Sequence, residues 1–328
     1  MTAYSIARRR LLSLLGGGAV AWPIVPRAQP TGKSHRILWV STEAQPDPFL
    51  DGFREGLRQR GYVEGQNLVI ESRYAPGNPE RLRAMIVDVM RSRPDLVVSS
   101  GPAMRALKEA KDIPVVFAVS GDPVELGIAQ SLSRPGGNFT GVTFLSLDLA
   151  GKRVELLKEA IPRLRTLAIL SNTDHPGERS ELRATLRAAE ASGIVAAYVP
   201  FLGASQLDKA LAAVRDARAG AMLVFPEGAT MANRAKVAQF AIASQIPSMF
   251  GWREYCDAGG LMSYGANQRA AHFRLAAYAD RVLRGENPAN IPIEQPTKFE
   301  LIINLKTAKT LGLTLSSTVL TRADEVIE

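Results

Sequence analysis

One short passage of this chain occurs twice. Residues 36–46 (RILWVSTEAQP) and 166–176 (TLAILSNTDHP) each run from apolar residues through small hydroxyl and amide residues into a polar loop with a proline. Each passage leads into a helical pattern closed by a glycine, Gly61 in the first and Gly193 in the second. A chain with two such halves is expected to form two similar α/β lobes. Because ligands of open α/β sheets bind outside the carboxyl ends of the strands, the repeat predicts a ligand site in a cleft between the lobes.

The first 28 residues have the layout of a secretory signal peptide and are set aside from the fold. Arg8, Arg9 and Arg10 precede a modest apolar stretch, residues 11–25, and Ala28 suits a cleavage site. The arginines followed by two leucines resemble a twin-arginine export signal. The apolar stretch is shorter than the roughly 20 residues of a membrane-spanning helix, although an uncleaved anchor is the alternative. We therefore expect export to the periplasm by the twin-arginine or the general secretory route.

The length suits two domains, and the charge argues against a nucleic-acid-binding protein. Removing 28 of the 328 residues leaves 300, which is long for one hydrophobic core. The signal holds four arginines and no acidic residue, so the formal charge falls from +8 to +4. No Lys/Arg cluster with interleaved aromatics indicates a nucleic-acid surface. The single cysteine, Cys256, allows no intrachain disulfide and is interpreted as a small half-buried residue, with a nucleophile as the alternative.

Short apolar runs alternate with amphipathic segments, a pattern typical of βαβ units and a parallel sheet. Asp47-Pro48 and Asn78-Pro79 read as helix N-caps followed by the first helical residue. The runs predict strands at 37–41, 68–74, 96–99 and 115–119 in the first half, and at 167–170, 194–199, 222–225, 248–250 and 261–263 in the second.

The end of the chain indicates that the polypeptide returns to the first lobe. A late helix closed by Gly285 is followed by an extended stretch, residues 291–304, and a short helix. We expect crossings near 143–146, 264–267 and 304, which together form a hinge. The predicted N-terminal lobe is 29–144 plus about 266–304, and the C-terminal lobe is 145–265 plus about 305–328.

Enzyme and metal signatures are missing from the sequence. It contains no G-x-S-x-G elbow, no Walker A loop and no G-x-G-x-x-G after a strand. His35, His175 and His272 are scattered without metal-ligand spacing. We expect no catalytic residue, no metal and no cofactor, with an enzyme of unrecognised type as the alternative.

Polar residues follow the predicted strands where their carboxyl ends should meet the cleft. Hydroxyls and helix N-terminal amides there would suit a ligand carboxylate, and acidic side chains would suit an ammonium. Aromatic rings could stack on an apolar part of the ligand. The alternative for the small polar residues is helix capping. The predicted ligand-binding residues are Ser41, Thr42, Ser100, Gly101, Ser120, Asp122, Asn172, Asp174, Glu227, Trp252, Tyr255 and Tyr264.

Several motifs, in this order, carry a family resemblance across nearly all of the mature chain. They are DGFREGL at 51–57, GDPV at 121–124, RPGGNFTG at 134–141, AGGLMSYG at 258–265 and EQPTKFEL at 294–301. With them the chain resembles the ABC transporter substrate-binding proteins whose characterised members bind tryptophan and other aromatic amino acids. The resemblance implies a type I periplasmic binding fold, with two Rossmann-like lobes, each a mainly parallel sheet flanked by helices, joined by a multi-crossing hinge.

The resemblance also implies a function. It predicts an exported receptor that closes on a small molecule, an aromatic or other amino acid, and delivers it to a membrane permease powered by a separate ATPase. We expect the receptor to act as a monomer. The alternatives are a ligand sensor for a membrane signalling protein and an enzyme on the same scaffold.

Overall fold

The computed structural model describes residues 34–328, apart from 43–46, 76–78, 102 and 145–146. Residues 34–328 form one compact unit. The predicted signal peptide, residues 1–28, lies outside the described residues. Among the helices that are described, none has both the length and the apolarity needed to cross a bilayer.

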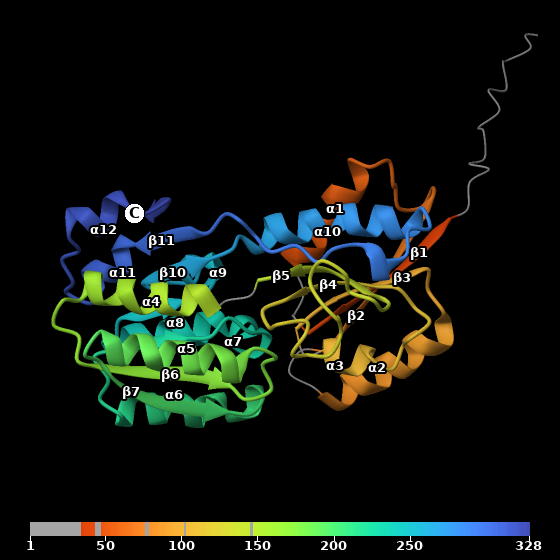
Figure 1. Ribbon diagram of the computed structural model, residues 1–328. Coiled ribbons are helices and arrows are strands. Elements are labelled where there is room, and N and C mark those ends of the chain that lie inside the picture. The colour runs from red at the N-terminus through yellow and green to blue at the C-terminus, as the bar shows by residue number, and fades with distance from the viewer. Residues whose placement is uncertain (1–33, 43–46, 76–78, 102, 145–146) are drawn as a thin grey trace, which may run out of the picture. The chain divides into compact units, whose positions relative to one another are not determined.

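The first lobe is a parallel sheet with the strand order β2-β1-β3-β4-β5 (Figure 1). Its last strand, β5, was not predicted, because Phe139 and Val142 are its only large apolar residues. A Cβ at Gly141 would lie 2.1 Å from the Phe117 carbonyl oxygen, so glycine permits the close pairing of β4 with β5. The strands are β1 (His35–Ser41), β2 (Leu68–Tyr74), β3 (Leu96–Ser100), β4 (Val115–Val119) and β5 (Phe139–Thr143).

In the described part of the chain, four α-helices accompany this sheet, and one of them comes from late in the sequence. Helix α10 (Gln268–Leu283) packs along α1 (Pro48–Arg58). A Cβ at Gly56 would lie 2.5 Å from the Phe273 carbonyl oxygen, so the glycine lets the two helix backbones approach closely. The other two are α2 (Pro79–Ser92) and α3 (Ala103–Leu107), and the short 3₁₀ turn η2 (Pro288–Asn290) follows α10.

The second lobe is a larger sheet with the order β12-β11-β10-β9-β8-β6-β7. All its pairings are parallel except that of β10 with β11, which is antiparallel. The strands are β6 (Thr166–Asn172), β7 (Val195–Phe201), β8 (Ala221–Val224), β9 (Ser248–Phe250), β10 (Met262–Gly265), β11 (Glu300–Asn304) and β12 (Glu325–Ile327). The helices are α4 (Leu147–Ala160), α5 (Glu178–Ala191), η1 (Ala204–Gln206), α6 (Leu207–Asp216), α7 (Gly228–Ala232), α8 (Arg234–Ala243), α9 (Arg253–Asp257), α11 (Leu305–Thr310) and α12 (Ser317–Thr321).

The chain passes between the sheets more than once, and its last passage comes earlier than the sequence indicated. Glu294 still belongs to the first lobe, where its amide donates to the Gly141 carbonyl at 3.0 Å and its carbonyl accepts from the Thr143 amide at 2.9 Å. Glu300 already opens β11, which pairs with β10 in the second sheet. The crossing therefore lies between these two residues rather than near Asn304. The expected fold of two mainly parallel, helix-flanked sheets is confirmed.

Candidate functional site

A pocket lies where strands of both sheets end. Its cavity volume is about 40 Å³, far below the roughly 300–1,000 Å³ of small-molecule sites, so the lobes are closed too tightly here to leave room for a ligand of amino-acid size. Residues that follow β1, β3 and β4 face residues that follow β6, β8 and β9, and the N-terminal ends of α1 and α10 add further side chains. The lining residues are Thr42, Phe49, Ser100, Gly101, Ala118, Ser120, Phe144, His175, Pro176, Glu227, Gly228, Trp252, Gln268 and His272.

Among the lining residues that the structure describes, Glu227 is the only Asp or Glu. It follows β8 and caps α7, where its carboxylate accepts from the Ala229 amide at 2.7 Å and the Thr230 amide at 2.5 Å. The Asn172 side-chain amide donates a third bond at 3.0 Å. The side chain is buried, with 3% exposed. Since an ionised carboxylate offers about four acceptor positions, roughly one remains for a ligand donor.

Aromatic rings form the apolar part of the pocket wall. Trp252 and Phe144 meet edge to face at 6.4 Å, and His272 stacks on Phe49 at 4.7 Å. The His272 Nδ1 lies 2.8 Å from the Gln268 carbonyl, which can only accept, so Nδ1 carries the hydrogen. Burial lowers the pKa of His272, which keeps its ring neutral near pH 7. These rings offer a flat apolar surface to a ligand.

Hydroxyl groups stand at the ends of the first-lobe strands. Ser120 is buried and donates to the Pro226 carbonyl of the second lobe at 3.1 Å. Thr42 and Ser100 are half-buried beside Gly101, whose positive φ of +62° turns the chain after β3. These four residues were predicted from the sequence, and together with Glu227 and Trp252 they line the pocket.

Three other predicted residues lie next to the pocket or support it. Ser41 is buried at the end of β1. Asn172 holds the Glu227 carboxylate, and its own oxygen accepts from the Asp174 and Gly203 amides at 3.2 and 3.3 Å. Asp174 points to the first lobe instead, where it pairs with Arg105 at 3.1 Å.

The remaining predicted residues do not belong to the pocket lining. Asp122 caps its own turn by accepting from the Val124 amide at 2.7 Å. Tyr255 is fully buried, stacks on Phe250 at 4.5 Å and bonds the Thr230 hydroxyl at 2.7 Å. Tyr264 packs its ring near Phe299.

Eight of the described lining residues were not predicted from the sequence. They come from strand ends, helix starts and loops: Phe49, Ala118, Phe144, His175, Pro176, Gly228, Gln268 and His272. Phe49 and Gln268 closely follow Asp47 and Asn267, the N-caps of α1 and α10. A helix N-cap shortly after a strand marks the sheet edge where the pocket lies, and this signal could have identified both residues.

Behind His175 lies a buried ionic network. The Arg153 guanidinium donates to the Glu181 carboxylate at 2.8 Å and, through Nε, to the Tyr264 carbonyl at 2.8 Å. The other Glu181 oxygen lies 3.2 Å from His175 Nε2. Burial lowers the pKa of Arg153, and the Glu181 carboxylate opposes this shift. The network joins a pocket residue to α4, α5 and the end of β10.

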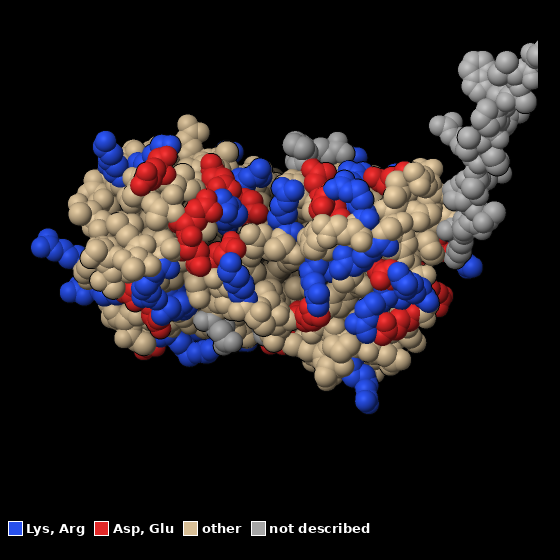
Figure 2. All heavy atoms as spheres, turned by 90° about the horizontal axis from the view of Figure 1, so that it is seen from above, with Lys and Arg blue, Asp and Glu red and all other residues tan. Residues whose placement is uncertain are grey.

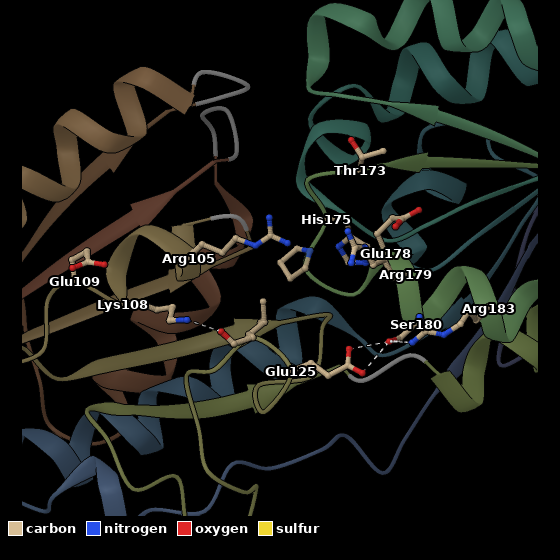
Figure 3. Close-up of a pocket in the computed structure, with 12 residues that line it drawn as sticks. Arg105, Lys108, Glu109, Glu125, Thr173, His175, Glu178, Arg179, Ser180 and Arg183 are labelled. Carbon is tan, nitrogen blue, oxygen red and sulfur yellow. Dashed lines mark hydrogen bonds between the residues drawn. The ribbon is translucent and has the colours of Figure 1, made fainter.

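Outside the pocket lies a wider groove of about 820 Å³ with charged walls (Figure 3). Arg105, Lys108 and Glu125 come from the first lobe, while Arg179 and Arg183 come from α5. His175 and Pro176 line both the groove and the pocket. We call this space the outer groove.

Metal-ligating clusters and the distribution of surface charge in the described residues bear on the class of ligand. No group of three or more His, Cys, Asp or Glu side chains in this part of the chain is placed to hold a metal ion. On the face seen in Figure 2, basic and acidic side chains of the described residues are interspersed. This charge pattern differs from the single-sign patches that bind nucleic acid.

Known proteins share this architecture. The structure of a conserved domain protein from Vibrio cholerae is similar with a TM-score of 0.85 and 25% identity, covering 90% of this chain and 100% of that one. An ABC domain from Streptococcus pneumoniae in complex with L-Trp gives a TM-score of 0.83 and 24% identity, with coverage of 90% and 100%. A tyrosine-binding protein of Clostridioides difficile is 24% identical over 273 residues, 81% of this chain and 78% of the relative.

The family comparison covers nearly all of the described unit. Residues 39–327 match the family described as ABC transporter substrate binding protein. The matched range holds both sheets apart from the first strand's opening residues, and it includes every residue that lines the pocket. The family is one of substrate-binding rather than catalytic proteins. The chain therefore belongs to the ABC transporter substrate-binding protein family.

Proposed function

We propose that this protein is the exported receptor of an ABC importer and that its pocket binds an aromatic amino acid. The observation that carries the proposal is the buried Glu227 carboxylate in a pocket that also has aromatic walls. The tyrosine-binding relative and the relative in complex with L-Trp support this ligand class.

Each part of such a ligand has a matching group. The ammonium would donate to the open acceptor position of Glu227, a charge-assisted bond in a buried setting. The ring would lie against Trp252 and Phe144. The lining residues that the structure describes include no Lys or Arg, so the ligand carboxylate would be bound by hydroxyls such as those of Thr42 and Ser100.

Closure of the lobes around the ligand would produce the transport-competent form. The ligand stabilises the closed state by binding it more tightly than the open state. In our proposal a monomer then presents this form to a membrane permease with its separate ATPase and releases the ligand unchanged. The proposal places the protein in the periplasm, delivered by a signal peptide within residues 1–28.

The experiment compares two ligands that differ only in the ammonium. L-tryptophan and indole-3-propionate share ring and carboxylate, and calorimetry gives the ratio of their Kd values for the wild type and for Glu227→Gln. We expect the wild type to prefer L-tryptophan and the variant to lose about tenfold of that preference, about 1.4 kcal/mol. The ratio cancels any general loss caused by the weakened cap of α7.

Glu254→Gln is the matched control, because Glu254 lies in the first turn of α9 outside the pocket lining. It should leave the ratio unchanged. An unaltered ratio in Glu227→Gln would remove Glu227 from ammonium recognition. If no aromatic amino acid binds the wild type at all, the proposed ligand class is wrong.

A further inference from the structure

Contacts outside the pocket join the two lobes at the outer groove. Arg105 of α3 pairs with Asp174, which follows β6, at 3.1 Å. Both side chains are well exposed, at 51% and 41%. Because none of the pocket-lining residues is part of this pair, a ligand in the pocket would not touch it.

A second contact also joins the two lobes at the outer groove, with the acidic residue on the first lobe and the arginine on the second. The Ser180 hydroxyl of α5 lies 2.9 and 3.2 Å from the two carboxylate oxygens of Glu125, which belongs to the loop after β4. Arg183 donates to the same hydroxyl at 3.1 Å (Figure 3). Glu125 of one lobe and Arg183 of the other are thus linked through a serine, and opposite charges face each other across the groove.

The backbones of the two lobes also touch. A Cβ at Gly121 would lie 2.9 Å from the Gly177 nitrogen, and a Cβ at Gly177 would lie 3.0 Å from the Ser120 carbonyl oxygen. Neither glycine has a positive φ, so the close approach, not the backbone conformation, is what excludes a side chain. The approach requires the lobes to be closed to the extent seen here.

We infer that these rim contacts, namely Arg105–Asp174, Glu125–Ser180–Arg183 and Gly121–Gly177, set how firmly the cleft closes. Arg105 and Asp174 are thereby affinity-determining residues that the ligand does not touch. The rim contacts act on the closing equilibrium and do so for any ligand that fills the pocket.

The physical link is the shared closed state. A ligand held by both lobes is bound most tightly when they are closed, so the free energy of closing enters its apparent affinity. Exposed pairs contribute little each, about 0.2–1 kcal/mol, and are screened by salt. Reversing the charge of one partner replaces an attraction by a repulsion. This roughly doubles the change in the free energy of closing, so the effect on the apparent Kd should be measurable.

The test reverses the charges singly and together. Asp174→Arg places like charges opposite each other, and Arg105→Asp with Asp174→Arg restores the attraction in the opposite sense. The Kd for L-tryptophan is measured at about 0.01 M and about 1 M salt, where the Debye length is roughly 30 and 3 Å. We expect Asp174→Arg to weaken binding about tenfold at low salt, much less at high salt, and the double variant to recover to within about twofold.

Small-angle scattering of the ligand-free protein supplies a readout that needs no ligand. Asp174→Arg should raise the radius of gyration, and the double variant should lower it again. If L-tryptophan does not bind the wild type, the proposed ligand fails while scattering still tests the rim contacts.

The control is Glu155→Lys, which reverses one partner of the exposed Lys152–Glu155 pair, 2.7 Å long and confined to α4. It should change neither the Kd nor the radius. The inference is overturned if Asp174→Arg behaves like the wild type in both measurements, or if the double variant is as impaired as the single one.

Discussion

Two arginine–carboxylate pairs near the cleft have similar lengths and opposite surroundings. Arg153–Glu181 is 2.8 Å long, with its side chains 1% and 2% exposed, and Arg105–Asp174 is 3.1 Å long, with its side chains 51% and 41% exposed. Distance alone would rank them as equals. Burial separates them, because the interior removes the water that would solvate a charge left without its partner.

The buried pair is part of one lobe's interior, whereas the exposed pair joins two lobes. Arg153 also holds the Tyr264 carbonyl at the end of β10, and Glu181 also contacts His175. Removing Arg153 should therefore act on folding, and removing Arg105 should act on closing.

Replacing Arg153 by Met should lower the free energy of unfolding by about 3–5 kcal/mol, because Glu181 would remain as a buried charge without its partner. Urea denaturation followed by circular dichroism measures this loss. Arg153→Met combined with Glu181→Leu removes both charges and should recover part of it. A loss below about 1 kcal/mol in the single variant would show that water reaches Glu181 and that the two pairs do not differ as described.

Glu254 tests whether burying a carboxylate oxygen that has no hydrogen-bond partner lowers the stability of the folded protein. One of its carboxylate oxygens is buried with no hydrogen-bond partner, and burial raises the pKa of Glu254 to about 6. The folded state therefore keeps the proton to higher pH than the unfolded state, and stability falls as the pH rises from about 4.5 to about 6.

Glu254→Gln should remove this loss. We expect it to raise the free energy of unfolding by about 1 kcal/mol at pH 8, because water around the partly exposed side chain weakens the effect of burial. At pH 4 we expect no gain. Urea denaturation at both pH values measures the difference. An equal gain at both would mean that ionisation of the carboxyl is not the cause.

The smallest effect is expected at the exposed pair. Arg105→Met should change the free energy of unfolding by no more than about 0.5 kcal/mol, since exposed pairs contribute little to folding. The same denaturation experiment applies, with Arg58→Met on the outer surface of α1 as a matched exposed arginine. A loss as large as that of Arg153→Met would contradict the distinction between folding and closing.

Much of the fold was predictable because its strands are short apolar runs bounded by polar loops. Runs such as 115–119 are buried on both faces of a parallel sheet and need no alternating pattern. Strands β5 and β12 were missed, because one is rich in Thr and Gly and the other is a three-residue strand at the sheet edge. The placement of β11 depends on antiparallel pairing with β10, which no local pattern reveals.

The site was predictable where a residue's place followed from strand polarity. Glu227 and Ser120 closely follow strands, so the sheet edge determines where they lie. Their ligand contacts remain a prediction. Tyr255 lies a few residues past β9, and one helical turn takes its ring into the core. His272 reaches the pocket from α10, a helix that comes from the far end of the chain, so only the tertiary fold places it there.

Because α10 returns to the first lobe late in the chain, the protein cannot be truncated to either half without losing helix packing. A polypeptide that stopped at residue 266 would keep all strands of the first sheet but leave Gly52 and Gly56 of α1 without the helix that packs on them. A polypeptide that began at residue 147 would carry α10 without α1, its main packing partner. The smallest segment that we expect to fold on its own is therefore the whole span 34–328. A reporter domain should be fused at the ends of this span or inserted at an exposed loop tip.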